Sequence, residues 1–279
     1  MLALDQRESL RAMLVAARAE ATDEALSRFK VQAVRSLTPF ASAVLLDVAY
    51  GLTAVRGAKA IAPGCGLIVA ADMLQQQRGG AVEDTDVDEA VLADDKIAAV
   101  ADAYKLLVIW RPDRGSDKRR RTVTRFLEAC RRRKRPAIVE GIVRPALGRE
   151  SLSPAQHTTA VLAAARELGE LRPDLYKAEV PTLGASADDV VTDAARELSA
   201  IVRCPWVVLS NGTPADRFAD AAIAACKGGA SGFLAGRAIW AASIEAPDIA
   251  ADLETSAAAR LRDLAARVDD VARPWRSAV

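Results

Sequence analysis

The stretch LYKAEVP, residues 175–181, is a short apolar run that carries two charged side chains and ends at a proline. Successive side chains of a β-strand point to opposite faces, so Lys177 and Glu179 would lie on the same face. Short, strongly apolar runs are typical of strands in a parallel sheet that is covered on both sides. The stretch therefore predicts a buried strand that presents charged groups on one face.

Seven further apolar runs of similar length occur along the chain, and amphipathic segments separate them. The eight predicted strands are Leu2–Leu4, Ala43–Leu46, Gly66–Ala71, Leu106–Trp110, Ala137–Val139, Leu175–Val180, Trp206–Leu209 and Gly232–Leu234. Four intervening segments have clear helical periodicity: Asp23–Ser36, Pro154–Leu168, Ala187–Val202 and Asp216–Lys227. Ser153 and Ser186 are the predicted N-caps of two of these helices. Such alternation predicts parallel strands joined by crossover helices.

The spacing of the predicted strands distinguishes between two folds. One marker near the end of each run gives Asp5, Asp47, Asp72, Lys105, Glu140, Lys177, Ser210 and Gly236. Neighbouring markers lie between 25 residues (Asp47 to Asp72) and 42 residues (Asp5 to Asp47) apart. A doubly wound sheet is the alternative, but its G-x-G-x-x-G turn is missing after the first run. We expect a single-domain (β/α)8 TIM barrel over residues 1–279, with residues 244–279 as helices that close it or make a subunit contact.

The composition excludes several classes of protein and of site. The chain has 51% hydrophobic residues, 38 Lys and Arg, and 37 Asp and Glu, which argues against a disordered chain or a nucleic-acid-binding protein. His157 is the single histidine, so the chain alone cannot surround a metal with imidazoles. The four cysteines have no CxxC spacing, which favours free thiols in the cytoplasm. We expect no metal, no cofactor and no membrane span.

Several further segments and residues have a structural interpretation. The polar, acidic segment Gln75–Asp95 predicts a long loop after the third strand. Two basic clusters, Lys118–Arg121 and Arg131–Arg135, predict a solvated helix face rather than a nucleic-acid site. We expect His157 at the surface or at a helix cap. Trp110 and Trp240 are predicted in the core or at a subunit contact.

The markers predict where chemistry occurs, because active sites of such barrels lie at the C-terminal ends of the strands. Burial and a nearby cation, Lys105, both disfavour the ammonium form of a lysine. A neutral Lys177 amine is a nucleophile that can form a Schiff base with a ketone. Glu140, on the strand between the two lysines, can move the protons that this reaction requires. The alternative is a structural Lys–Glu ion pair that fills the barrel interior.

Two further groups of residues predict substrate binding. The pairs Ser210/Gly212 and Gly236/Arg237 follow the last two strands, where barrels often bind phosphate. Asp5, Gln6 and Arg7 follow the first strand and suit a polyol with an anionic end. The alternative for the first group is two ordinary turns between strand and helix. The alternative for Asp5, Gln6 and Arg7 is a solvated loop.

Several strings resemble the class I tagatose-1,6-bisphosphate aldolases and the related sulfofructosephosphate aldolases. They are LALDQRESLR, FKVQAVRSLTPFASAVLLD (29–47), IVAAD (68–72), KLLVIWRPD (105–113), LYKAEVP (175–181) and GASGFLAGRAIWA (229–241). The resemblance covers nearly the whole chain and implies a metal-free barrel aldolase that is a homo-oligomer, a dimer or tetramer.

The same resemblance implies a role for each candidate residue. Lys177 would form the Schiff base, with Glu140 and Lys105 as acid and base partners and Asp5 orienting substrate hydroxyls. Ser210, Gly212, Gly236 and Arg237 would hold the phosphate of dihydroxyacetone phosphate, while Gln6 and Arg7 could face the other end of the substrate.

The resemblance also implies the substrate class, a phosphorylated ketohexose. We expect 6-deoxy-6-sulfofructose 1-phosphate, cleaved to dihydroxyacetone phosphate and sulfolactaldehyde. Three alternatives remain open: a tagatose or fructose 1,6-bisphosphate aldolase, a metal-dependent aldolase, and a non-catalytic barrel that binds sugar phosphates.

Overall fold

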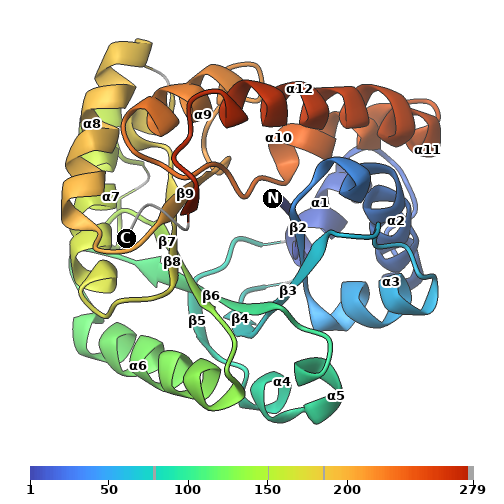
Figure 1. Ribbon diagram of the computed structural model, residues 1–279, viewed down its shortest axis with the longest axis horizontal. Coiled ribbons are helices and arrows are strands. Elements are labelled where there is room, and N and C mark those ends of the chain that lie inside the picture. Colours follow the sequence, from blue (N-terminus) through green and yellow to red (C-terminus); the bar gives the residue numbers. More distant parts are fainter. Residues whose placement is uncertain (78–79, 150, 185, 276–279) are drawn as a thin grey trace.

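The fold is a ring of parallel strands enclosed by helices (Figure 1). The computed structural model describes residues 1–77, 80–149, 151–184 and 186–275. Within them, seven parallel strands pair in the order β1-β2-β3-β6-β7-β8-β9. Their bounds are β1 Leu2–Leu4, β2 Ala43–Leu46, β3 Gly66–Ala70, β6 Ala103–Trp110, β7 Ala137–Val143, β8 Leu175–Glu179 and β9 Trp206–Leu209.

Residues 232–235 occupy the eighth position and close the sheet. Phe233 forms a parallel bridge with Val208 of β9, and Ala235 forms another with Leu2 of β1. Each of the eight predicted strands therefore has its place in the ring. The predicted (β/α)8 barrel is confirmed.

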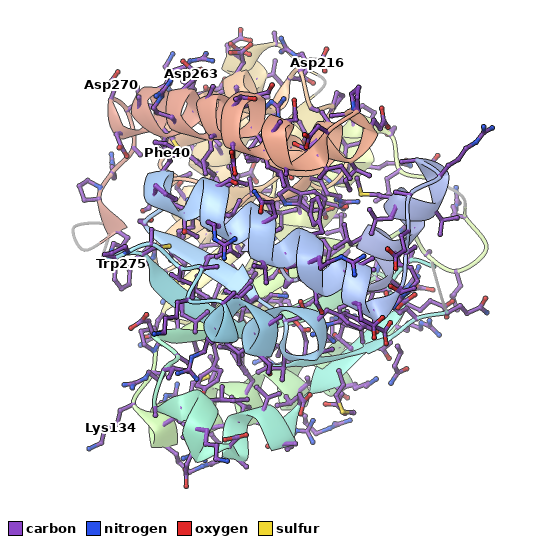
Figure 2. The ribbon with its side chains drawn as sticks, turned by 90° about the vertical axis from the view of Figure 1, so that its right-hand side faces the viewer. Phe40, Lys134, Asp216, Asp263, Asp270 and Trp275 are labelled. Carbon is purple, nitrogen blue, oxygen red and sulfur yellow. The ribbon has the colours of Figure 1, made fainter. Side chains whose placement is uncertain are left out.

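Helices form the outer layer. They are α1 Glu8–Ala16, α2 Asp23–Leu37, α3 Thr53–Gly57, α4 Glu89–Ala93, α5 Asp95–Ala98, α6 Ser116–Arg133, α7 Pro154–Gly169, α8 Asp188–Ile201, α9 Phe218–Lys227, α10 Arg237–Trp240, α11 Ile249–Asp252 and α12 Ala258–Asp269. Figure 2 shows α2 lying between α12 and α3 on one side of the molecule. Its inward stripe of Leu26, Phe29 and Ala33 is buried, as the helical spacing predicts. No described helix has the length and apolarity that a membrane span requires.

Alternation along the strands separates two apolar layers. Even-numbered residues of β1, such as Leu2 and Leu4, pack against the helices, whereas Ala3 points into the barrel. The barrel interior is filled by a separate cluster, here called the interior plug. The plug consists of Ala3, Leu45, Ile68, Ala70, Ala103, Ile138, Leu175, Val207 and Leu234. At this level the described residues fill the barrel interior as a packed core.

The segment after β3 differs from the predicted loop. Asp72–Gln75 (β4) and Asp84–Val87 (β5) form an antiparallel hairpin, and α4 follows. The prediction of a long loop over Gln75–Asp95 was therefore wrong, although residues 78–79 lie outside the described part. The polar composition of the segment concealed a strand alternation, in which the buried Thr85 and Val87 alternate with the more exposed Asp84 and Asp86.

The structure also tests the predictions for helix caps, tryptophans and cysteines. Ser153 caps α7 in a capping box with Gln156, as predicted. Ser186 is not a cap, because α8 begins after Ala187 with no side-chain cap. Trp110 and Trp240 are both buried in the core. The four cysteines are free thiols.

The basic helix α6 agrees in part with the predicted solvated face. Val123 and Phe126 belong to its buried stripe, and most of its arginines are exposed. Arg119 differs, because it is buried and donates two 2.8 Å hydrogen bonds to Glu167.

Candidate active site

The candidate site lies directly above the interior plug. Every second residue of a strand points into the barrel, so the next inward residue after each plug residue belongs to the layer above it. On β6, Ala103 of the plug is followed two residues later by Lys105. In the same way Glu140 follows Ile138 on β7, and Lys177 follows Leu175 on β8. The charged residues therefore share the barrel axis with the plug and lie one layer closer to the C-terminal ends of the strands. Glu140 and Lys177 are direct partners in the register of β7 and β8.

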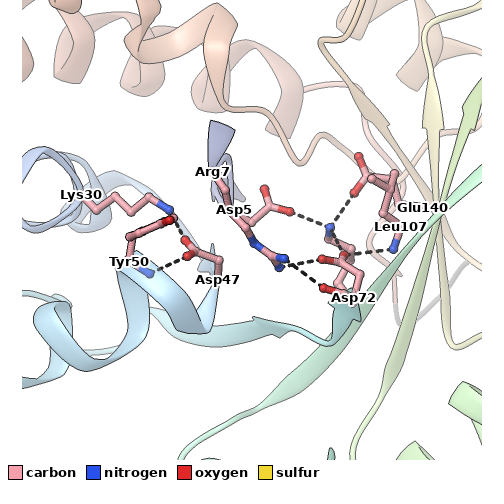
Figure 3. A network of polar contacts seen from close by, with 9 residues as sticks. Asp5, Arg7, Lys30, Asp47, Tyr50, Asp72, Leu107 and Glu140 are labelled. Atoms are coloured by element: carbon pink, nitrogen blue, oxygen red, sulfur yellow. Dashed lines mark hydrogen bonds and ion pairs between the residues drawn. The ribbon is translucent and has the colours of Figure 1, made fainter. Parts of the chain in front are cut away.

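Lys105 lies at the centre of a network of carboxylates. Figure 3 shows these carboxylates, Asp5, Asp72 and Glu140, turned toward one another. Its Nζ is 2.6 Å from Asp5, 2.7 Å from Asp72 and 3.2 Å from Glu140. Burial alone would lower the pKa of Lys105, but the three carboxylates outweigh burial and hold it well above its ordinary value. Lys105 is therefore a fixed cation in the floor of the site.

Asp5 completes the network from β1. Burial alone would raise the pKa of Asp5, but the charges of Lys105, Lys177 and Arg7 hold it well below its ordinary range. Asp5 is thus an ionised acceptor beside a permanent cation. Such a group can accept hydrogen bonds from hydroxyls.

Glu140 joins the two lysines. Its Oε1 is 2.9 Å from Nζ of Lys177, and its Oε2 is 3.2 Å from Nζ of Lys105. The Lys177 side chain is only 4% exposed. A buried amine in contact with a carboxylate that already has a second cation is an arrangement suited to proton transfer at that amine.

Arg7 and Gln6 lie on one side of the pocket above this floor. Arg7 donates to Oδ1 of Asp72 at 2.8 Å and to the carbonyl of Asp72 at 3.0 Å. Oδ2 of Asp72 accepts from Lys105, so Asp72 fixes both cations. The buried Oε1 of Gln6 has no hydrogen-bond partner among the described residues. This side therefore offers an amide and a guanidinium.

Ser210, Gly236 and Arg237 line the same pocket, and Gly236 lies next to Gln6, because a Cβ at Gly236 would be 2.9 Å from Nε2 of Gln6. A Cβ at Gly236 would lie 2.4 Å from the carbonyl oxygen of Ala3, so only glycine permits this close approach. Gly212 is exposed in the turn after β9 and is not among the described residues that line the pocket. The pocket holds about 930 Å³, part of it open to solvent.

Three residues near Arg237 were absent from the predicted set. Arg144 and Asn211 line the pocket, and Glu179 lies beneath Asn211. Burial lowers the pKa of Arg144, and the nearby Arg111 and Arg237 lower it further. The sequence contained a signal for each of them. Ile142 to Arg144, Leu209 to Asn211 and Lys177 to Glu179 are all single steps of the inward alternation.

Two sequence interpretations require correction. Asp47 belongs to the row of markers, but Figure 3 shows it turned toward Lys30. Both side chains are fully buried there, and Asp47 also accepts from the backbone N–H of Tyr50 at 2.7 Å. His157 is not at the surface, because it is 3% exposed, with Nε2 3.7 Å from Glu179. The apolar face of α7 carries it inward.

The described residues contain no group of three or more His, Cys, Asp and Glu side chains arranged to hold a metal ion. The site instead combines an amine, a carboxylate and a cation at its floor. The guanidinium groups of Arg7, Arg144 and Arg237 line the pocket. It can therefore bind an anionic molecule and exchange protons at a buried amine.

Comparison with known proteins shows that the chain is an aldolase. A family model described as DeoC/LacD family aldolase matches residues 1–242, and the chain belongs to that family. A tagatose 1,6-diphosphate aldolase of Listeria monocytogenes is 30% identical over 306 aligned residues, which cover 98% of this chain and 88% of the relative. Tagatose 1,6-diphosphate aldolase 2 of Streptococcus pyogenes is 28% identical over 302 aligned residues, with 98% and 91% covered.

Solved aldolase structures share the fold. A fructose-bisphosphate aldolase of Plasmodium falciparum has a TM-score of 0.72 at 14% identity, with 98% of this chain and 90% of the other covered. An archaeal fructose-1,6-bisphosphate aldolase, solved with its catalytic lysine bound to a carbinolamine intermediate, has a TM-score of 0.58 at 17% identity. Coverage in that pair is 96% and 93%. These similarities support the barrel assignment.

Proposed function

We propose that this aldolase works through a Schiff base on Lys177. The observation that carries the proposal is the contact of 2.9 Å between the buried amine of Lys177 and Glu140, which also contacts Lys105. A neutral amine attacks the C2 ketone of a ketose and forms a carbinolamine. Glu140 supplies the proton with which the carbinolamine hydroxyl leaves as water, and an iminium remains.

The iminium then acts as the electron sink for cleavage. A base removes the proton of the C4 hydroxyl, the C3–C4 bond breaks, and its electron pair moves into the iminium to form an enamine. The aldehyde leaves. The enamine takes up a proton at C3, and water hydrolyses the resulting iminium to release dihydroxyacetone phosphate and regenerate the amine. Asp5 orients substrate hydroxyls, and Lys105 keeps Glu140 and Asp5 in place.

The proposed substrate is a ketohexose 1-phosphate with a second anion at C6. Ser210, Gly236 and Arg237 bind the 1-phosphate, with the backbone of Gly212 nearby. Gln6 and Arg7 bind the other end of the substrate. We propose 6-deoxy-6-sulfofructose 1-phosphate as the substrate, which yields sulfolactaldehyde beside dihydroxyacetone phosphate. Three guanidinium groups line the pocket, those of Arg7, Arg144 and Arg237, and they support a substrate with two anionic ends.

Borohydride reduction tests the mechanism. The reaction with substrate should add the mass of the reduced adduct to Lys177, as located by peptide mass spectrometry. Lys177→Ala should lose both the adduct and turnover. A folded Lys177→Ala protein with normal turnover would refute the mechanism, and loss of turnover in EDTA would favour a metal-dependent reaction.

Tagatose or fructose 1,6-bisphosphate is the second candidate substrate. The observation that favours it is the identity of the curated relatives, which are tagatose 1,6-diphosphate aldolases. A comparison of kcat/KM for the two bisphosphates and the sulfonate decides the question. A strong preference for either bisphosphate would refute the sulfonate.

We further propose that the enzyme acts in the cytoplasm as a homo-oligomer, a dimer or tetramer. Four free thiols are consistent with a reducing compartment. Light scattering coupled to gel filtration measures the mass of the assembly. A monomer at all concentrations would contradict the second part of this proposal.

A further inference from the structure

The layer above Lys177 contains a buried carboxylate that the proposed mechanism does not use. Glu179 lies two residues beyond Lys177 on β8, and its side chain is 2% exposed. An ionised carboxylate is costly to bury unless donors surround it. Glu179 has such donors: the backbone N–H of Val143 at 2.7 Å and Nδ2 of Asn211 at 2.6 Å.

These contacts fix the orientation of the Asn211 amide. Glu179 can only accept in its ionised form, so the amide nitrogen of Asn211 must face it. The Oδ1 atom then faces the other way, and Nη2 of Arg237 donates to it at 2.5 Å. A guanidinium can only donate, so both contacts require the same orientation of the amide. Glu179, Asn211 and Arg237 form a chain of hydrogen bonds. The buried carboxylate of Glu179 determines which group donates and which accepts along this chain.

The exposed end of this chain faces the pocket. Asn211 and Arg237 line it beside Ser210 and Arg144. Arg237 is half-buried, and its long side chain has many rotamers to lose when it binds an anion. A guanidinium held in place before binding loses less conformational freedom and binds more tightly.

We infer that Glu179 and Asn211 are positioning residues that hold Arg237 ready for the phosphate of the substrate. The inference rests on the proposed function, which assigns the phosphate to Arg237. Neither residue takes part in bond making. The competing role is structural, in which Glu179 and Asn211 only join the ends of β7, β8 and β9.

Two small ketones separate these roles. Dihydroxyacetone phosphate and dihydroxyacetone differ only in the phosphate, and both should label Lys177 on borohydride reduction. The measured quantity is the concentration of each ketone that gives half-maximal labelling. For Asn211→Ala we expect about a tenfold rise for dihydroxyacetone phosphate and no change for dihydroxyacetone. An equal rise for both ketones, or no rise for either, would overturn the inference.

A double variant tests whether Asn211 acts through Arg237. Arg237→Ala should abolish most of the preference for the phosphorylated ketone, and Asn211→Ala should add nothing further in that background. Additive effects of the two substitutions would also overturn the inference. Thr213→Val is the matched control, because its buried hydroxyl in the same turn has no partner among the described residues.

The outcomes distinguish this inference from the proposed function. If wild-type Lys177 is labelled but the preference survives Asn211→Ala, only the inference fails. If neither ketone labels wild-type Lys177, the Schiff-base function fails. Titration calorimetry of dihydroxyacetone phosphate against the same variants then decides the inference by the same tenfold criterion.

Discussion

Oε1 of Glu140 lies 2.9 Å from Nζ of Lys177, and the two residues are direct neighbours across β7 and β8. The other oxygen of Glu140 lies 3.2 Å from Lys105. One carboxylate therefore contacts two lysines from adjacent strands. Only Lys177 is free of further carboxylates among the described ion pairs, since Lys105 also contacts Asp5 and Asp72. The proposed mechanism uses this asymmetry: proton transfer takes place at Lys177, and Lys105 fixes the charge of Glu140.

Glu140→Gln should preserve the shape of the site and remove its proton carrier. We expect kcat to fall by about 10²- to 10⁴-fold, because general acid–base catalysis typically contributes that much. Steady-state kinetics measures the fall, and the KM should change much less. Labelling of Lys177 by borohydride should be slower but should reach the same mass. An unchanged kcat in the folded variant would exclude Glu140 as the proton carrier.

Lys105→Met should destabilise the protein, because it leaves Asp5, Asp72 and Glu140 close together without their shared cation. Removing one partner of a buried ion pair typically costs about 3–5 kcal/mol of the free energy of unfolding. Urea denaturation measures the loss. Adding Asp72→Asn should recover part of it, because one uncompensated charge is removed.

Lys96→Met is the control for that experiment. Lys96 is exposed on α5, so the substitution should change the free energy of unfolding by less than about 0.5 kcal/mol. Equal effects of the two lysine substitutions would show that the network around Lys105 contributes nothing to stability.

The same network predicts a pH dependence of stability. The pKa of Asp5 is lowered on folding, so its contribution is present above its ordinary value of 3.8 and is lost as the pH falls through the folded value. The pKa of Lys105 is raised, so its contribution is present below its ordinary value of 10.5 and is lost only as the pH rises through the folded value. Both contributions are complete between these limits.

Asp5→Asn tests the acid side of this dependence. The variant should be less stable than the wild type at neutral pH, and the difference should shrink as the pH falls below about 4. Urea denaturation at a series of pH values gives both free energies. A difference that stays constant down to about pH 2 would contradict a lowered pKa of Asp5.

The sequence predicted the barrel and its charged layer because both depend on one local rule. Alternation of side chains along β8 determines that Leu175 and Lys177 share a face, and the same holds for Ile138 and Glu140 on β7. The charged layer could therefore be read from residues two positions beyond the plug. The same alternation also places Glu179, two residues beyond Lys177, on the inward face of β8.

The remaining features depend on contacts between distant parts of the chain. Asp47 has the same position in its repeat as Asp5, but Lys30 on α2 neutralises it and turns it away from the pocket. No local pattern indicates that Lys30 is fully buried. The hairpin β4–β5 was missed for a different reason, since Asp84 and Asp86 made a strand look like a loop.

Gly236→Ala tests the close approach that places Arg237 beside the pocket. The new Cβ would lie 2.4 Å from the backbone oxygen of Ala3 and 2.9 Å from Nε2 of Gln6. The carbonyl of Ala3 also accepts from the indole of Trp240 at 3.0 Å, so it cannot shift without breaking that bond. We expect a loss of about 1–3 kcal/mol in the free energy of unfolding, as for other overpacked sites.

Gly57→Ala is the matched control, because it is also a glycine-to-alanine change but has open space. No atom lies within 4 Å of a Cβ at Gly57, and the residue ends α3 with ordinary backbone geometry. Alanine should therefore leave stability unchanged or raise it by up to about 1 kcal/mol. Thermal and urea denaturation compare the two variants directly. If Gly236→Ala were as stable as Gly57→Ala, the contact between the eighth strand position and β1 would have to be looser than the structure describes.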